Sequence, residues 1–292
     1  KIIIVNDSPW IQPSQELRGQ LANVHQVEIS ILDLAVNSGH QRAISVGMAW
    51  LDQQQLDYDA LIILDSDGED RPEDALALIY CLERTGLAAC VAVRRSRQEN
   101  ICFRFLYQCY KAIFIISCGK KLNFGNFMAL TPYGVKNLLY LDDTPVHVGA
   151  ALLKSRLPFA RKKVARAKRF NGTSKMGGYE HLVVHAFRSF SVLGEQILAR
   201  LLIFGAMACA AFLFLGLMAI AMRFSGLFNF AVSPGWTTLV LLVLLGSAVN
   251  CSLLVFALAL TLVKSRSIRS PAPYELMLML VRSHFIFTPD SQ

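Results

Sequence analysis

The stretch Ala60-Leu61-Ile62-Ile63-Leu64-Asp65-Ser66-Asp67 decides the fold, because five apolar residues run directly into an acidic turn. A short apolar run bounded by turn residues is typical of a buried strand, and burial on both faces is typical of the centre of a parallel sheet. We therefore predict a central strand over residues 60–64, with Asp65 and Asp67 at its carboxyl end.

Strand and helix patterns alternate around this stretch. Apolar runs predict further strands over residues 2–5, 27–32 and 87–93. Helical spacing predicts helices over residues 42–56 and 73–84, the second with Pro72 near its first turn. The alternation indicates an α/β fold with a doubly wound sheet, whose ligands bind at the carboxyl ends of its strands.

The acidic turn is a candidate metal site. Alternate residues of an extended backbone point the same way, so Asp65 and Asp67 can converge on one ligand. Mg²⁺ typically uses one or two carboxylates together with substrate phosphates. Asp70 follows closely and is either a catalytic acid or base, or the N-cap of the next helix. The sequence has neither GxxxxGK[ST] nor GxGxxG, so metal and side chains would have to bind phosphate.

The positive charge of the chain is concentrated in one segment. The 292 residues carry a net charge of +8, and residues 154–175 contain nine cations and no acid. This segment has few aromatic residues and precedes apolar sequence, which argues against a nucleic-acid surface. Arg161, Lys162 and Lys163 can lie on a membrane surface, and Arg94 either faces a ligand or lies in a solvated loop.

Two long uncharged runs follow the cationic segment, 22 residues between Arg200 and Arg223 and 40 between Arg223 and Lys264. We predict membrane helices over about Leu201–Met222 and Trp236–Val263, since a span needs about 20 apolar residues. The alternative is a buried hairpin of a soluble protein. Cations flank both outer ends, so the positive-inside rule places both flanks in the cytoplasm. Residues 179–200 suit an interfacial helix, and the tail after Pro271 is apolar enough to lie on the membrane.

Together these motifs resemble the family 2 glycosyltransferases of GT-A fold, a Rossmann-like nucleotide-sugar-binding fold. The resemblance rests on Asp7 after a strand, Asn37-Ser38-Gly39 before a helix, Asp65-Ser66-Asp67 with Pro72-Glu73 behind it, and Arg166-Ala-Lys-Arg169-Phe-Asn-Gly-Thr-Ser-Lys175. Within that family the chain is similar to the polyprenyl-phosphate glycosyltransferases, including dolichol-phosphate mannose synthase and the bacterial undecaprenyl-phosphate glucosyltransferases with a C-terminal pair of membrane helices. The resemblance covers about residues 1–265.

The resemblance implies three sets of site residues. The nucleotide sugar would be bound by Asp7, Asn37, Gly39 and Asp65, and Arg94 is a further candidate from its position just after a predicted strand. A divalent metal, Mg²⁺ or Mn²⁺, would be held by Asp65 and Asp67, with Asp70 as a further catalytic candidate. The acceptor phosphate would be gripped by Arg166, Arg169 and Lys175, since Arg binds phosphate oxygens bidentately.

The chain departs from the family pattern at two motifs. Asn126 stands in Gly125-Asn126-Phe127 where the family often has Asp, and Gly-Glu-Asp-Arg follows the acidic triplet. A lipid phosphate acceptor is already anionic near pH 7 and needs no strong base, so the loss of the Asp favours a phosphate acceptor over a hydroxyl. The family's opening strand would precede Lys1, so we expect the sequence to lack an N-terminal piece.

We therefore expect a cytoplasmic GT-A domain over residues 1–178, an interfacial helix over 179–200, a transmembrane hairpin over 201–263 and a cytoplasmic or interfacial tail over 264–292. The expected function is an inverting transfer of a sugar from a nucleotide-diphosphate sugar to a membrane polyprenyl phosphate. The alternatives are transfer to a hydroxyl of a lipid-linked glycan, and a non-catalytic scaffold. The bacterial inner membrane is favoured over the endoplasmic reticulum, and bacterial relatives suggest a homo-oligomer.

Overall fold

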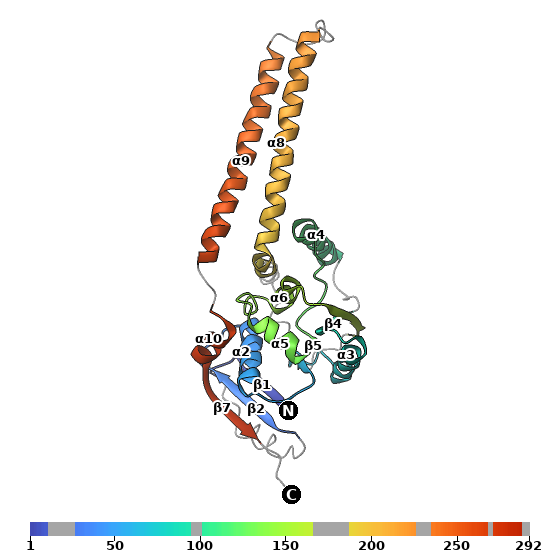
Figure 1. Ribbon diagram of the computed structural model, residues 1–292, viewed down its shortest axis with the longest axis vertical. Coiled ribbons are helices and arrows are strands. Elements are labelled where there is room, and N and C mark those ends of the chain that lie inside the picture. Colours follow the sequence, from blue (N-terminus) through green and yellow to red (C-terminus); the bar gives the residue numbers. More distant parts are fainter. Residues whose placement is uncertain (11–26, 95–100, 166–186, 226–234, 268–270, 288–292) are drawn as a thin grey trace. The chain divides into compact units, whose positions relative to one another are not determined.

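The structure is a computed structural model that describes residues 1–10, 27–94, 101–165, 187–225, 235–267 and 271–287. The chain divides into two units (Figure 1). Unit 1 comprises Lys1–Lys111, Lys120–Val192 and Ser270–Gln292, and unit 2 comprises Ala112–Gly119 and Leu193–Arg269. Unit 1 contains two sheets with their helices, and unit 2 contains two long apolar helices.

The first sheet has the order β1-β2-β7. Strand β1 (Ile2–Asn6) runs parallel to β2 (Ile29–Leu34), which confirms two predicted strands. Helix α2 (His40–Gln53) lies close to β1, because a Cβ at Gly47 would come within 2.9 Å of Val5 Cγ2. The predicted core positions of this helix are buried, namely Ala43, Val46, Trp50 and Leu51.

The third strand of this sheet comes from the C-terminal end of the chain. Helix α10 (Pro273–Leu280) leads into β7 (Val281–Phe287), which pairs antiparallel with β2. Ser283 Oγ lies 3.4 Å from Asp33 Oδ2, while Asp33 Oδ1 accepts a 2.9 Å hydrogen bond from Asn6 Nδ2. The sequence predicted a cytoplasmic or interfacial tail here, and the structure shows that residues 281–287 complete a sheet of unit 1.

The second sheet has the order β3-β5-β4-β6. Its strands are β3 (Leu61–Ile63), β5 (Met128–Leu130), β4 (Ala89–Arg94) and β6 (Phe159–Val164). Among the described residues, β3 pairs with β5 alone, and the pairing is antiparallel. The prediction that residues 60–64 form a central strand of a parallel sheet is therefore wrong. The inner positions of this sheet belong to β5 and β4. The apolar run over residues 60–64 predicts a strand, but it does not predict which strand will pair with it.

Helix α3 (Pro72–Thr85) covers one face of this second sheet, as its periodicity predicts. Pro72 begins the helix, where its missing N–H costs nothing, and Gly86 ends it with φ of +63°. Three side chains at helical spacing are buried against the strands, namely Ala75, Leu78 and Leu82. Their partners include Cys90, Ala129 and Val164. Helices α4 (Ile101–Cys118), α5 (Pro132–Leu139) and α6 (Val148–Ser155) complete the described helices between β4 and β6.

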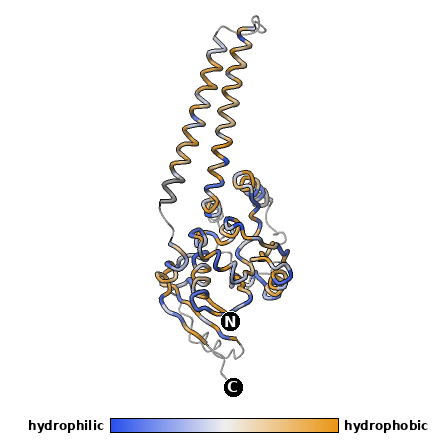
Figure 2. The backbone as a smooth tube through the Cα atoms, viewed as in Figure 1, coloured by the Kyte–Doolittle hydropathy of each residue, from blue (hydrophilic) through white to orange (hydrophobic). Residues whose placement is uncertain are grey.

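Unit 2 consists mainly of α8 (Gly194–Ser225) and α9 (Trp236–Ser267), and apolar residues make up most of both helices (Figure 2). Of the most apolar window of each helix, 6% of α8 and none of α9 is buried within the structure. The alternative of a buried soluble hairpin does not match this exposure. The two helices pack at Gly205, where a Cβ would lie 2.8 Å from Val255 Cγ2.

The boundary before α8 differs from the predicted interfacial helix over 179–200. Residues 179–186 lie outside the described part of the chain, residues 187–192 are helical, and a turn at Leu193 precedes α8. The Arg200 Nη1 atom donates hydrogen bonds to the carbonyls of Ile116 (2.7 Å) and Ile115 (3.3 Å). The Arg200 guanidinium therefore caps the C-terminal end of α4 by donating to its last carbonyl groups.

Candidate active site

Asp7 organises the loop that leads into α2. Its Oδ1 accepts hydrogen bonds from the Ser38 backbone N–H (2.7 Å) and the Ser38 hydroxyl (3.1 Å), and its Oδ2 accepts one from the Gly39 N–H (2.8 Å). Asn37 Nδ2 donates to the Asp7 carbonyl at 2.9 Å. Gly39 has φ of +86°, which a side chain would oppose. The structure therefore brings together Asp7, Asn37 and Gly39, which the sequence grouped through resemblance alone.

The acidic turn after β3 holds Asp65 and Asp67 partly exposed, and Asp70 buried with 5% of its surface accessible. Asp70 Oδ2 accepts a 3.1 Å hydrogen bond from the Asp65 N–H, and Asp67 Oδ1 accepts one of 3.0 Å from the Glu69 N–H. The alternative that Asp70 caps α3 is wrong, because the N-cap is Arg71, without a side-chain cap bond. Asp70 instead supports the backbone of Asp65.

The donor set of this turn fits a divalent metal that substrate helps to bind. The described residues contain no group of three or more His, Cys, Asp and Glu side chains able to hold a metal. Asp65 and Asp67 supply two carboxylates, and Mg²⁺ and similar ions keep waters and take phosphate oxygens at such sites. Two carboxylates leave part of the coordination shell of a metal open. The residues therefore fit a metal whose remaining ligands come from a diphosphate and water, rather than a site made of protein ligands alone.

His40 is a site residue that the sequence analysis missed. It is the first residue of α2, next to the Gly39 N–H that binds Asp7. Partial burial lowers the pKa of His40, and nearby charges act in both directions, since Asp65 and Asp7 raise this pKa and Arg188 lowers it. The imidazole is therefore within electrostatic range of both acidic segments and of one cation. Its position directly after Asn37-Ser38-Gly39 was the available signal.

Asn126 occupies the position where the sequence noted the loss of a carboxylate. It precedes β5 and has 8% of its surface accessible. Gln41, near the start of α2, donates from Nε2 to Asn126 Oδ1 at 2.9 Å. The position is therefore filled by a neutral, hydrogen-bonded amide, which cannot serve as a carboxylate base.

The predicted phosphate-binding residues Arg166, Arg169 and Lys175 lie outside the described residues. Arg94 ends β4, in register with Val164 of β6. The cations Arg161, Lys162 and Lys163 are exposed on β6, and the Arg161 guanidinium lies 4.8 Å from the centre of the Phe159 ring. Charged residues of this kind also keep a strand at the edge of a sheet from pairing with other chains.

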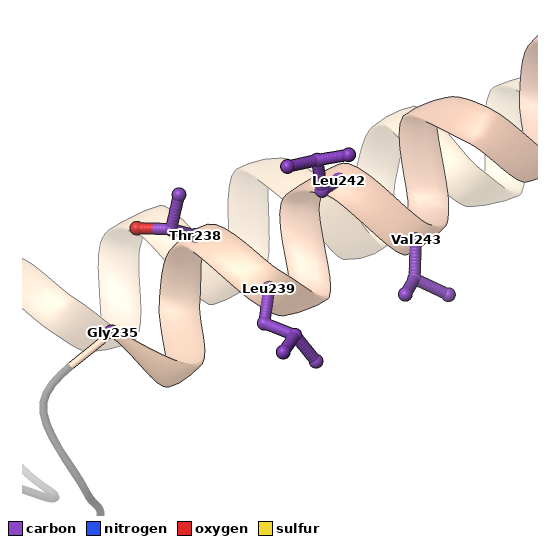
Figure 3. A pocket seen from close by; sticks show the side chains of 5 residues that line it. All are labelled: Gly235, Thr238, Leu239, Leu242 and Val243. Carbon is purple, nitrogen blue, oxygen red and sulfur yellow. The ribbon is translucent and has the colours of Figure 1, made fainter.

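A surface hollow of about 500 Å³ lies on α9 (Figure 3). Its lining is Gly235, which directly precedes α9, and Thr238, Leu239, Leu242 and Val243 from the first turns of α9. The hollow includes none of the acidic residues and offers one hydroxyl, so it lacks the polar groups that a nucleotide sugar requires.

Comparison with known proteins finds a family model that covers the acidic segments. The model of glycosyl transferase family 2 matches residues 1–141, a region that includes Asp7, the acidic turn and Asn126. No curated protein matches the chain. The matched region has the mixed strands and helices of a GT-A domain, and two long apolar helices follow it. Residues 1–141 therefore match a family 2 glycosyltransferase domain, and this match supports glycosyltransferase activity for the chain.

Proposed function

We propose that the protein is a membrane-anchored, inverting glycosyltransferase that moves a sugar from a nucleotide-diphosphate sugar to a polyprenyl phosphate. The main support is the combination of a family 2 domain with two exposed apolar helices whose flanking segments both belong to unit 1. A sugar acceptor embedded in the membrane suits a catalytic domain that is anchored next to it.

The two acidic segments would bind the donor. Asp7, Asn37 and Gly39 would contact the nucleoside, and Arg94 would approach the donor from the end of β4. Asp65 and Asp67 would hold Mg²⁺ or Mn²⁺, which neutralises charge on the departing diphosphate. Asp70 would keep Asp65 in place through the Asp65 N–H.

The acceptor would be a phosphate, bound by Arg166, Arg169 and Lys175. One acceptor oxygen bonds to the anomeric carbon from the face opposite the leaving group. The bond from that carbon to the diphosphate oxygen breaks, and its electron pair leaves with the nucleoside diphosphate. A monoester phosphate is largely ionised near pH 7, so this step requires no proton removal. The neutral Gln41–Asn126 pair is compatible with such an acceptor.

The hairpin would anchor the domain with both flanks on one side of the membrane. Segments before α8 and after α9 both belong to unit 1, which requires the two helices to leave and return on the same side if they cross. Cations are more frequent at these outer flanks than in the connection between the helices, which favours the cytoplasmic face. Of the membranes available, we favour the bacterial inner membrane.

Transfer assays on membranes that contain the full chain test this function. Labelled UDP-glucose, UDP-N-acetylglucosamine and GDP-mannose are supplied separately with polyprenyl phosphate and Mg²⁺ or Mn²⁺. We expect one donor to give a lipid product labile to mild acid, and we expect EDTA and Asp67→Ala to abolish it. An acid-stable glycolipid would support the hydroxyl acceptor. No transfer from any donor, with normal cellular function in Asp67→Ala, would support a scaffold.

A further inference from the structure

A chain of buried amides connects α6, α2 and the start of β5. The Val148 N–H donates to Gln41 Oε1 at 2.7 Å, and Gln41 Nε2 donates to Asn126 Oδ1 at 2.9 Å. A backbone N–H can only donate, so it fixes Oε1 of Gln41 on its own side and turns Nε2 toward Asn126. The orientation of the Asn126 amide follows in turn, with its oxygen toward Gln41.

This orientation leaves the Asn126 Nδ2 group as a hydrogen-bond donor. Within the described part of the chain, the hydrogen bond of Asn126 runs through Oδ1. The residue as a whole has 8% of its surface accessible, and Nδ2 is not among the buried atoms without a partner. The amide is therefore held in one orientation by its oxygen, while its nitrogen can donate to water or to a bound ligand.

The pairing of β3 with β5 puts Asn126 at the same end of the ladder as the acidic turn. Met128 of β5 pairs with Ile63 of β3 in an antiparallel ladder. Asp65 follows the end of β3 and Asn126 precedes the start of β5, so both lie just beyond the same end of this antiparallel ladder. The start of α2 approaches the same place, because Asp65 acts on the pKa of His40, the neighbour of Gln41.

We propose that Asn126 binds the sugar of the donor, with Nδ2 donating to a sugar oxygen, and that Gln41 is the positioning residue that keeps this amide turned toward the sugar. The inference rests on the proposed function in one respect, because it takes the donor to be a nucleotide sugar. A neutral amide suits this place, since it bonds a hydroxyl without adding a third negative charge beside Asp65 and Asp67.

Binding measurements that separate the sugar from the nucleotide test the proposal. The full chain in detergent, with Mn²⁺, is titrated with UDP and GDP and with UDP-glucose and GDP-mannose. Asn126→Asp keeps an oxygen that accepts from Gln41 Nε2 but loses the donor. We expect this variant to bind the free nucleoside diphosphate within about twofold of wild type and the sugar nucleotide about 10-fold more weakly, the effect of one hydrogen bond. Asn137→Asp, which adds the same charge on α5, should change neither.

The positioning role of Gln41 is tested by a double-mutant cycle. Gln41→Met removes the donor to Asn126 Oδ1 with a side chain of similar length. We expect Gln41→Met to weaken sugar-nucleotide binding selectively, and we expect the loss in Gln41→Met with Asn126→Asp to be no larger than in Asn126→Asp alone, because both act through one amide.

Three results would overturn the inference. These are an equal loss of free nucleotide and sugar nucleotide in Asn126→Asp, an unchanged affinity for both, and a defect confined to the KM of the lipid acceptor. A wild-type chain that binds no sugar nucleotide would overturn both this inference and the proposed function. A wild-type chain that binds the donor but transfers to a hydroxyl would overturn the proposed acceptor alone.

Discussion

The hydroxyl of Tyr274 donates a 2.6 Å hydrogen bond to Asp52 Oδ2, joining residues that are 222 positions apart. Tyr274 lies in α10, after the apolar hairpin, and Asp52 lies near the end of α2. Burial, followed by the charge and hydrogen bond of Asp52, raises the pKa of Tyr274, so the phenol stays protonated as the donor. The bond fastens the returning tail to the helix that begins at the candidate nucleotide site.

Tyr274→Phe should therefore lower the stability of unit 1. A hydrogen bond to a charged group contributes about 1.5–3 kcal/mol when buried, and partial exposure reduces this to about 1 kcal/mol. Thermal unfolding in detergent should show a lower Tm for Tyr274→Phe, and Tyr133→Phe, at a side chain 65% exposed, should match wild type. An unchanged Tm in both variants would mean that the bond does not hold the tail.

The local elements of unit 1 could be read from the sequence, but their pairing could not. Periodicity and Pro72 predicted α2, α3 and the first two strands, because local patterns encode single elements. The strand over residues 61–63 was predicted, but its position in the sheet was wrong, because the apolar run does not indicate that β5 is its pairing partner. Strand β7 was missed because its partner β2 is about 250 residues away in the sequence.

The candidate site shows the same division. Asp7 and Asp65 were recognisable because each follows a strand in a known motif. His40 and Gln41 were not, because their relevance depends on where α2 begins and on contacts with residues far along the chain, such as Asn126.

Asp67→Asn should lower transfer activity by about 10²–10³-fold, the usual effect of removing one group that stabilises developing charge. The amide oxygen can still accept from the Glu69 N–H, so the turn should keep its shape. The turnover number at saturating Mn²⁺, measured beside the Tm, checks this. Asp59→Asn is the matched control, because Asp59 is an exposed acid just before β3. Near-normal turnover in Asp67→Asn would exclude Asp67 as a metal ligand.

Acid should destabilise the wild type through His40. Its pKa is lowered in the folded protein, so the unfolded chain, with a His pKa of about 6.5, binds the proton first. The contribution to stability is present above that value and is lost as the pH falls below it. Unfolding in EDTA between pH 7.5 and pH 5 should show the stability of the wild type falling relative to His40→Gln. A relative gain on acidification would mean that Asp65 and Asp7 stabilise the imidazolium.

Packing between α8 and α9 depends on a small residue at position 205. An added methyl group at Gly205 would lie 2.8 Å from Val255 Cγ2, while one at Gly246 on α9 would meet nothing within 4 Å. Small residues let membrane helices approach closely, and overpacking costs about 1–3 kcal/mol. Gly205→Ala should therefore lower the Tm of the hairpin and Gly246→Ala should not.

Disulfide formation provides a second measurement of the spacing between α8 and α9, because Cys209 Sγ lies 3.3 Å from Ser252 Oγ and Ser252→Cys places a second thiol there. Oxidation should join Cys209 to the new thiol readily in Ser252→Cys and more slowly when Gly205→Ala is added. Equal rates in the two proteins would show that Gly205 does not set the helix spacing.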